Sequence, residues 1–105
     1  MNNQPVMSLL SGGGYSDYVT AHRDQIIEVN STENISIAEW AGVPEVWLTA
    51  LMLMGDMGKG EGKVMVYGGA SGVGTSLVQL LKMQGYDVYC TVSTDHKKKF
   101  IENNL

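Results

Sequence analysis

The sequence predicts an α/β chain, in which a β-containing first part and two junction helices precede one β-α-β unit of a doubly wound parallel sheet. Three observations predict that unit: an apolar run at residues 64–67, a glycine-rich loop at residues 68–74, and helical apolar spacing over residues 75–83. A second strand pattern follows at residues 87–92. Because two parallel strands do not form a stable sheet, we expect these 105 residues to be a fragment.

Composition and charge exclude several classes of protein. The 44% of hydrophobic and 17% of charged residues are typical of a globular chain. No basic stripe with interleaved aromatic residues is present, which argues against nucleic acid as the main partner. No apolar run is long enough to span a membrane and no signal peptide is evident, so we expect a cytoplasmic protein. The single cysteine, Cys90, excludes a disulfide framework and a Cys-rich zinc site, and no metal is expected.

The first part of the chain contains weak strand signals followed by helix signals. Residues 15–20 and 25–29 are predicted as short strands. Ser36 and Glu39 form a capping box that predicts a short helix, which residues 42–44 should interrupt. Residues 46–54 are apolar except for Thr49, and Gly55 should end this second helix. A helix that is apolar on all sides has to be buried on all sides, which again indicates a larger assembly.

The glycine loop from Gly68 to Gly74 lies between a strand and a helix, as a dinucleotide fingerprint requires. Glycines allow the main chain to approach a pyrophosphate, whose charge then meets the free amides at the start of the helix. The alternative is a tight turn that binds nothing. Gly85 should end the helix, and residues 97–104 should form another.

Cofactor choice is expected at the end of the second strand, where an NAD enzyme usually offers a carboxylate to the ribose. Here Ser93 and Thr94 offer hydroxyls, and Lys97 follows one helical turn later. These groups favour a 2′-phosphate and therefore NADPH. Asp95 argues in the other direction, and a solvated helix face is the alternative interpretation of residues 97–99.

Three segments occur in one order at characteristic spacings: residues 12–19, residues 43–50 and the glycine loop. Together they resemble the zinc-independent quinone oxidoreductase branch of the medium-chain dehydrogenase/reductases, over residues 6–105. The resemblance implies a partial GroES-like β-barrel domain at 1–35, junction helices at 36–58 and a partial Rossmann domain at 59–105. It also implies hydride transfer from NADPH to a small-molecule quinone or enone. A homodimer of the full-length protein is compatible with it.

The resemblance also implies roles for individual residues. Ser71, Gly72 and Val73 would approach the pyrophosphate, and Thr49 would lie near the nicotinamide. Ser93 and Lys97 would hold the adenosine phosphate. No catalytic base carries over to this chain, because the groups that line such a substrate site come from a part of the domain upstream of it.

Two other hypotheses compete with this one. The glycine loop also resembles that of the short-chain dehydrogenases, although the Y-x-x-x-K pair of those enzymes is missing here. The second alternative is a truncated, non-catalytic module that binds a dinucleotide, or that binds a partner through the apolar helix at residues 46–54.

Overall fold

A computed structural model describes residues 3–30, 34–55, 57 and 60–105 of the chain. The chain divides into two compact units, residues 1–45 and 46–105. The domain boundary predicted between residues 58 and 59 lies outside the described residues. Among the helices of the described ranges, none is long and apolar enough to cross a membrane.

The first unit contains a small antiparallel sheet. Strand β1 (Val6–Ser8) pairs with β2 (Ile26–Glu28), and the 3-10 helix η1 (Arg23–Gln25) leads into β2. The strand predicted at 25–29 is confirmed in shortened form, whereas β1 was not predicted. The strand predicted at 15–20 is wrong, because this segment is irregular and exposed. Its local hydrogen bonds explain the difference: the Ser16 hydroxyl donates to the carbonyl oxygens of Gly13 and Tyr18, in place of a strand ladder.

Two helices follow, as the sequence predicts. Helix α1 (Ile37–Ala41) begins at the capping box, in which the Ser36 Oγ accepts from the Glu39 amide at 3.3 Å. The Ser36 amide donates to the Glu39 carboxylate at 2.8 Å. Gly42 separates α1 from α2 (Val43–Met54), so the predicted interruption is confirmed at Gly42 alone. Residues 43 and 44 already belong to α2, which begins three residues before the predicted helix at 46–54. Pro44 lies in the first turn of α2. Backbone N–H groups in this turn have no acceptor within the helix, so the N–H that proline lacks costs no hydrogen bond.

The capping box makes the start of α1 dependent on pH. The hydrogen bond from the Ser36 hydroxyl has the larger effect on the Glu39 carboxyl, and the bond from the Ser36 amide has the smaller one. Both lower the pKa of this carboxyl below its ordinary value. A lowered folded pKa stabilises α1 above the unfolded carboxyl pKa, and this contribution disappears as pH falls through the lowered value. We expect the Ser36 amide shift, followed by NMR, to change with Glu39 protonation. In Glu39→Gln, which keeps the capping geometry, the same transition should be absent, and its persistence would assign it to another group.

Helix α2 is not buried on every side within this chain. Ala50 is fully buried and Met54 is 8% exposed, but Met52 is 82% exposed and Leu53 is 62% exposed. The apolar pattern therefore fits one buried face, while the opposite face of α2 is open within this chain. Apolar residues on all sides of the helix are not all buried here, because 105 residues do not supply enough chain to surround them.

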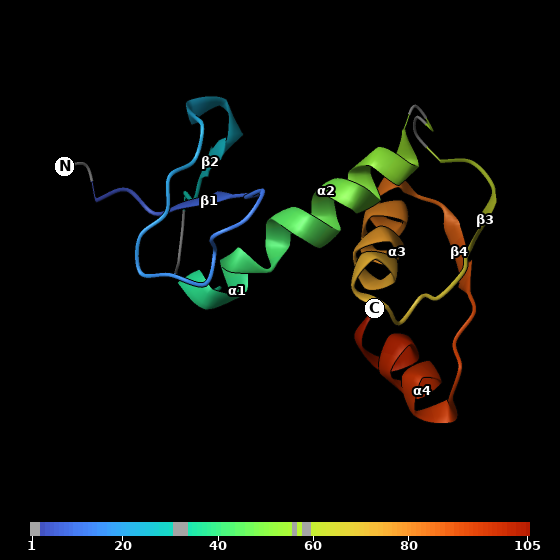
Figure 1. Ribbon diagram of the computed structural model, residues 1–105. Coiled ribbons are helices and arrows are strands. Elements are labelled where there is room, and N and C mark those ends of the chain that lie inside the picture. Colours follow the sequence, from blue (N-terminus) through green and yellow to red (C-terminus); the bar gives the residue numbers. More distant parts are fainter. Residues whose placement is uncertain (1–2, 31–33, 56, 58–59) are drawn as a thin grey trace. The chain divides into compact units, whose positions relative to one another are not determined.

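The second unit is the predicted β-α-β arrangement. Strand β3 (Lys63–Val66) and strand β4 (Asp87–Cys90) are parallel neighbours, connected through α3 (Gly72–Gln84), and α4 (Asp95–Asn104) follows (Figure 1). Gly85 ends α3 in the left-handed conformation at φ 96°, as predicted. Both strands end earlier than expected, and α4 begins two residues before the predicted helix, because the Thr94 hydroxyl caps its first turn.

The core of this unit lies between α3 and one face of the strands. Its buried members are Met54, Val66, Val78 and Leu81. Cys90 packs against this cluster as a partly buried residue, as expected for a core cysteine. The other face of the two strands is open: Met65 and Tyr89 are register partners, and they are 53% and 50% exposed. Parallel strands are normally covered on both faces.

Candidate functional site

The glycine loop connects the end of β3 to the start of α3. Gly68 has a φ of 72°, a left-handed value that favours glycine. Its carbonyl oxygen accepts from the Ser71 amide at 2.9 Å, which turns the chain toward the helix. Ser71 is the N-cap of α3, and its Oγ accepts from the Gly74 amide at 3.0 Å. The loop is therefore a tight, internally bonded turn that ends at a helix start.

Two further glycines are required by close packing. A Cβ built on Gly69 would lie 2.5 Å from the Cβ of Cys90 on β4. A Cβ on Gly74 would meet the carbonyl oxygen of Gly68 and would lie 2.9 Å from the Cα of Gly69. Side chains at these positions would push the loop away from β4 or from the first turn of α3. Close packing within the chain therefore requires glycine at these two positions, whether or not a ligand binds to the loop.

The first turn of α3 offers amide donors. The Thr75 amide donates to the Ser71 carbonyl at 2.8 Å, and the Gly74 amide is capped. Within the part of the chain that the structure describes, the amides of Gly72 and Val73 have no hydrogen-bond acceptor, as expected for the first residues of a helix. Gly72 is exposed and Val73 is half-buried. This arrangement suits an anionic group, because the free amides and the positive end of the helix dipole both lie at the start of α3.

The predicted phosphate residues lie together at the start of α4. The Lys97 Nζ donates to the Ser93 Oγ at 3.1 Å, and both side chains are exposed. The Lys97 amide is itself bonded to the Thr94 Oγ1 at 3.3 Å. One ammonium group and two hydroxyls are therefore gathered within one turn, and these groups supply the charge and donors that a phosphate monoester needs.

Thr49 is placed on α2, half-buried, one helical turn after Val46. The Val46 side chain lies beside the glycine loop, since a Cβ built on Gly72 would be 3.0 Å from its Cγ1. Residues three apart share a helix face, so Thr49 belongs to the side of α2 that faces the loop. Its assignment to the nicotinamide remains a prediction.

One residue of this arrangement was missed by the sequence analysis. Thr91 follows β4 directly, and its Oγ1 accepts from the Gly68 amide at 3.0 Å. Its carbonyl oxygen accepts from the Gly69 amide at 2.9 Å. Nothing in the sequence distinguishes Thr91 from the β-branched residues of a strand, and so only the three-dimensional pairing reveals this contact.

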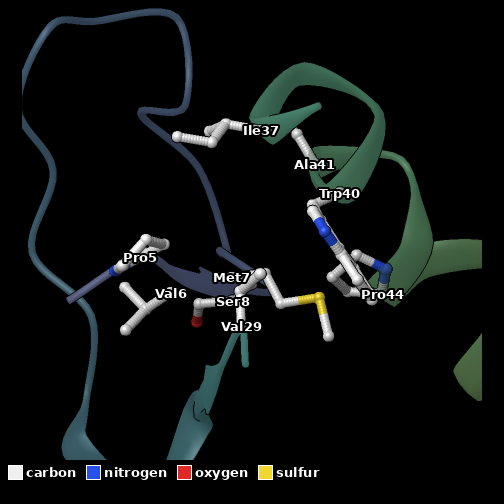
Figure 2. A pocket seen from close by; sticks show the side chains of 9 residues that line it. All are labelled: Pro5, Val6, Met7, Ser8, Val29, Ile37, Trp40, Ala41 and Pro44. Carbon is white, nitrogen blue, oxygen red and sulfur yellow. The ribbon is translucent and has the colours of Figure 1, made fainter. Parts of the chain in front are cut away.

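The first unit has an apolar pocket of about 190 Å³ that the sequence did not predict. Figure 2 shows its walls, with the Met7 sulfur on the side of Trp40 and Pro44. Ser8 lines it with a hydroxyl group, which donates to the neighbouring Leu9 carbonyl. The pocket suits a small aliphatic group. Among the described residues, no group of three or more His, Cys, Asp or Glu side chains is arranged to hold a metal ion.

Comparison with known proteins gives a consistent result. A reducing polyketide synthase, rads1 of Floropilus chiversii, is 33% identical over 99 residues, which is 91% of this chain and 4% of that protein. The phenolphthiocerol synthesis polyketide synthase type I Pks15/1 of Mycobacterium marinum is 36% identical over 91 residues, 84% of this chain and 4% of that protein. The highly reducing polyketide synthase easB of Emericella nidulans is 32% identical over 92 residues, 83% of this chain and 3% of that protein.

The chain is similar to a short segment of polyketide synthases. It spans about 4% of the length of the first of these relatives. No family model matches the chain, and no solved structure matches it. The relatives are enzymes by name, so the coarse expectation of an enzyme segment is supported.

The finer assignment from the sequence is wrong. The expected fragment of a quinone or enone oxidoreductase of the medium-chain dehydrogenase/reductases is overturned, because the similar proteins are polyketide synthases over most of this chain. The physical reason is that the motifs behind the resemblance describe a capped helix and a tight strand-to-helix turn. Such local geometry sets the path of the backbone and is compatible with an anionic ligand. It does not identify the acceptor of a reaction.

Proposed function

We propose that residues 60–105 form the first β-α-β unit of a doubly wound dinucleotide-binding sheet, and that they bind NADPH for a reductive step of a polyketide synthase. The proposal rests on one observation above all: the Lys97 ammonium is hydrogen-bonded to the Ser93 hydroxyl at the end of the strand beside the glycine loop. Names of the relatives, such as "reducing polyketide synthase", support a reductive step.

The residues present fit this dinucleotide. The amides of Gly72 and Val73 would bind the pyrophosphate at the start of α3, where Ser71 shapes the turn through its cap on Gly74. Ser93 and Lys97 would hold the 2′-phosphate through one hydroxyl and one positive charge. Thr49 would lie toward the nicotinamide end. When bound, NADPH supplies the hydride, while these residues bind and orient it.

Lys97→Ala is the direct test of cofactor choice. Loss of the ammonium group removes a charge-assisted hydrogen bond to the 2′-phosphate, whereas NADH has no such phosphate. We expect the Kd for NADPH to rise about tenfold and the Kd for NADH to change by less than about twofold. Isothermal titration of the chain with both nucleotides measures these changes.

Lys98→Ala is the matched control for this test. Lys98 is the next residue of α4, and its Nζ lies 3.8 Å from the Glu102 carboxylate instead of beside Ser93. The control removes the same charge one position away, so both affinities should stay near those of the unaltered chain. Equal losses for NADPH and NADH in Lys97→Ala would exclude Lys97 from the phosphate site.

A further inference from the structure

Thr91 connects the two halves of the proposed site through three hydrogen bonds. Its amide donates to the Val66 carbonyl at 3.0 Å and continues the pairing of β3 with β4. Its carbonyl oxygen accepts from the Gly69 amide at 2.9 Å. Its Oγ1 accepts from the Gly68 amide at 3.0 Å. Two consecutive loop amides are therefore bonded to one residue of the neighbouring strand end.

The hydrogen bond to the Thr91 hydroxyl comes from Gly68, the residue at which the loop turns toward α3. Gly68 has left-handed backbone angles, and its carbonyl oxygen accepts from the amide of Ser71, the N-cap of α3. That same carbonyl oxygen is in close approach to Gly74 in the first turn of the helix. The Thr91 hydroxyl holds the peptide before the Gly68 Cα through the Gly68 amide, and the Thr91 carbonyl holds the peptide after it through the Gly69 amide. With both of these peptides held, the Gly68 carbonyl oxygen is placed for the Ser71 amide, and so is the start of α3.

Thr91 is also close in sequence to the phosphate residues. Ser93 follows it after one residue, and the Ser93 hydroxyl is the acceptor of the Lys97 ammonium. The backbone bonds of Thr91 hold this segment to β3, while its hydroxyl holds the glycine loop. The two functions lie on different atoms of one residue, so they are separable by substitution.

We propose that Thr91 is a positioning residue, whose hydroxyl sets the glycine loop at the right place for a dinucleotide pyrophosphate relative to the Ser93 and Lys97 phosphate pair. This inference rests on the proposed dinucleotide-binding function. Thr91 does not contact the cofactor in this role; its hydroxyl acts through the peptide that joins Tyr67 to Gly68.

The test compares Thr91→Val and Thr91→Ser, titrated with NADPH, NADH and adenosine 2′-monophosphate. Valine keeps the shape and the backbone bonds but lacks the acceptor oxygen, whereas serine keeps that oxygen. We expect Thr91→Val to weaken NADPH and NADH alike, by about fivefold, which is the effect of one lost hydrogen bond. Adenosine 2′-monophosphate, which has no pyrophosphate, should bind unchanged. Thr91→Ser should stay within about twofold of the unaltered chain for all three.

Thr20→Val is the control for loss of a threonine hydroxyl, since Thr20 is exposed and lies in the first unit. It should leave all affinities unchanged. A merely structural role of Thr91 would weaken all three ligands together, and that result would overturn the proposal. Unchanged NADPH affinity in Thr91→Val would overturn it as well, while the proposed function would stand.

Hydrogen exchange in the unaltered chain gives a reading that needs no variant. The Gly68 amide, bonded to the Thr91 hydroxyl, should exchange more slowly than the Gly72 amide at the open start of α3. Equally fast exchange at both amides would overturn the positioning role. Failure of the unaltered chain to bind NADPH would overturn the proposed function itself, and the positioning role with it.

Discussion

Gly74→Ala should abolish measurable NADPH binding. The added methyl group would collide with the Gly68 carbonyl oxygen and would lie 2.9 Å from the Gly69 Cα. Both are backbone atoms of the same tight loop, so no side-chain rotation relieves the collision. The loop must move away from the first turn of α3, and such overpacking costs about 1–3 kcal/mol of stability. Isothermal titration and a thermal melt of the variant measure the two effects.

Gly12→Ala is the matched control for this substitution. A Cβ on Gly12 would meet nothing within 4 Å, and its φ is outside the left-handed region. The same chemical change should therefore leave NADPH affinity and the melting temperature unchanged. Undiminished NADPH affinity in Gly74→Ala would show that the amides at the start of α3 do not bind the pyrophosphate.

Leu81→Ala should remove a large part of the stability of the second unit. Leu81 is 1% exposed and packs with Met54, Val66 and Val78 in its core. Truncating a buried leucine costs about 2–5 kcal/mol. A unit of this size has a free energy of unfolding of about 3–9 kcal/mol, at about 0.05–0.15 kcal/mol per residue. The substitution thus removes a large part of the stability, which urea unfolding followed by circular dichroism would measure.

Met83→Ala provides the comparison on the same helix. Met83 is 81% exposed, so its truncation removes little buried surface and leaves helix propensity unharmed. The midpoint of unfolding should stay close to that of the unaltered chain. Equal destabilisation by the two substitutions would mean that α3 does not pack in the way described.

The parts of the fold that could be predicted are those with a local physical cause. The Ser36 capping box, the Gly85 helix end and the strand that precedes the glycine loop follow from residue types at fixed spacing. The site residues Ser93 and Lys97 could be paired because one turn of helix separates them. Their function as a phosphate site remains a proposal, since spacing brings groups together without naming a ligand.

The parts that could not be predicted depend on contacts between distant segments. Strand β1 was missed because its three residues carry no alternation, and its pairing with β2 is what makes it a strand. Thr91 was missed because its hydroxyl reaches a glycine amide 23 residues away. The enzyme family was assigned wrongly, because the motifs behind the resemblance describe local backbone geometry, and such geometry does not identify the acceptor of a reaction.

The open face of β3 and β4 has a practical consequence for every titration described above. Met65 and Tyr89 form an apolar pair there, and Tyr67 beyond the strand end is 83% exposed. If two copies of the chain paired face to face, these side chains would be shielded from water, and the extent of that association would grow with protein concentration. Dilute samples therefore favour the single chain, and an affinity that varies with protein concentration would reveal self-association rather than a property of the glycine loop.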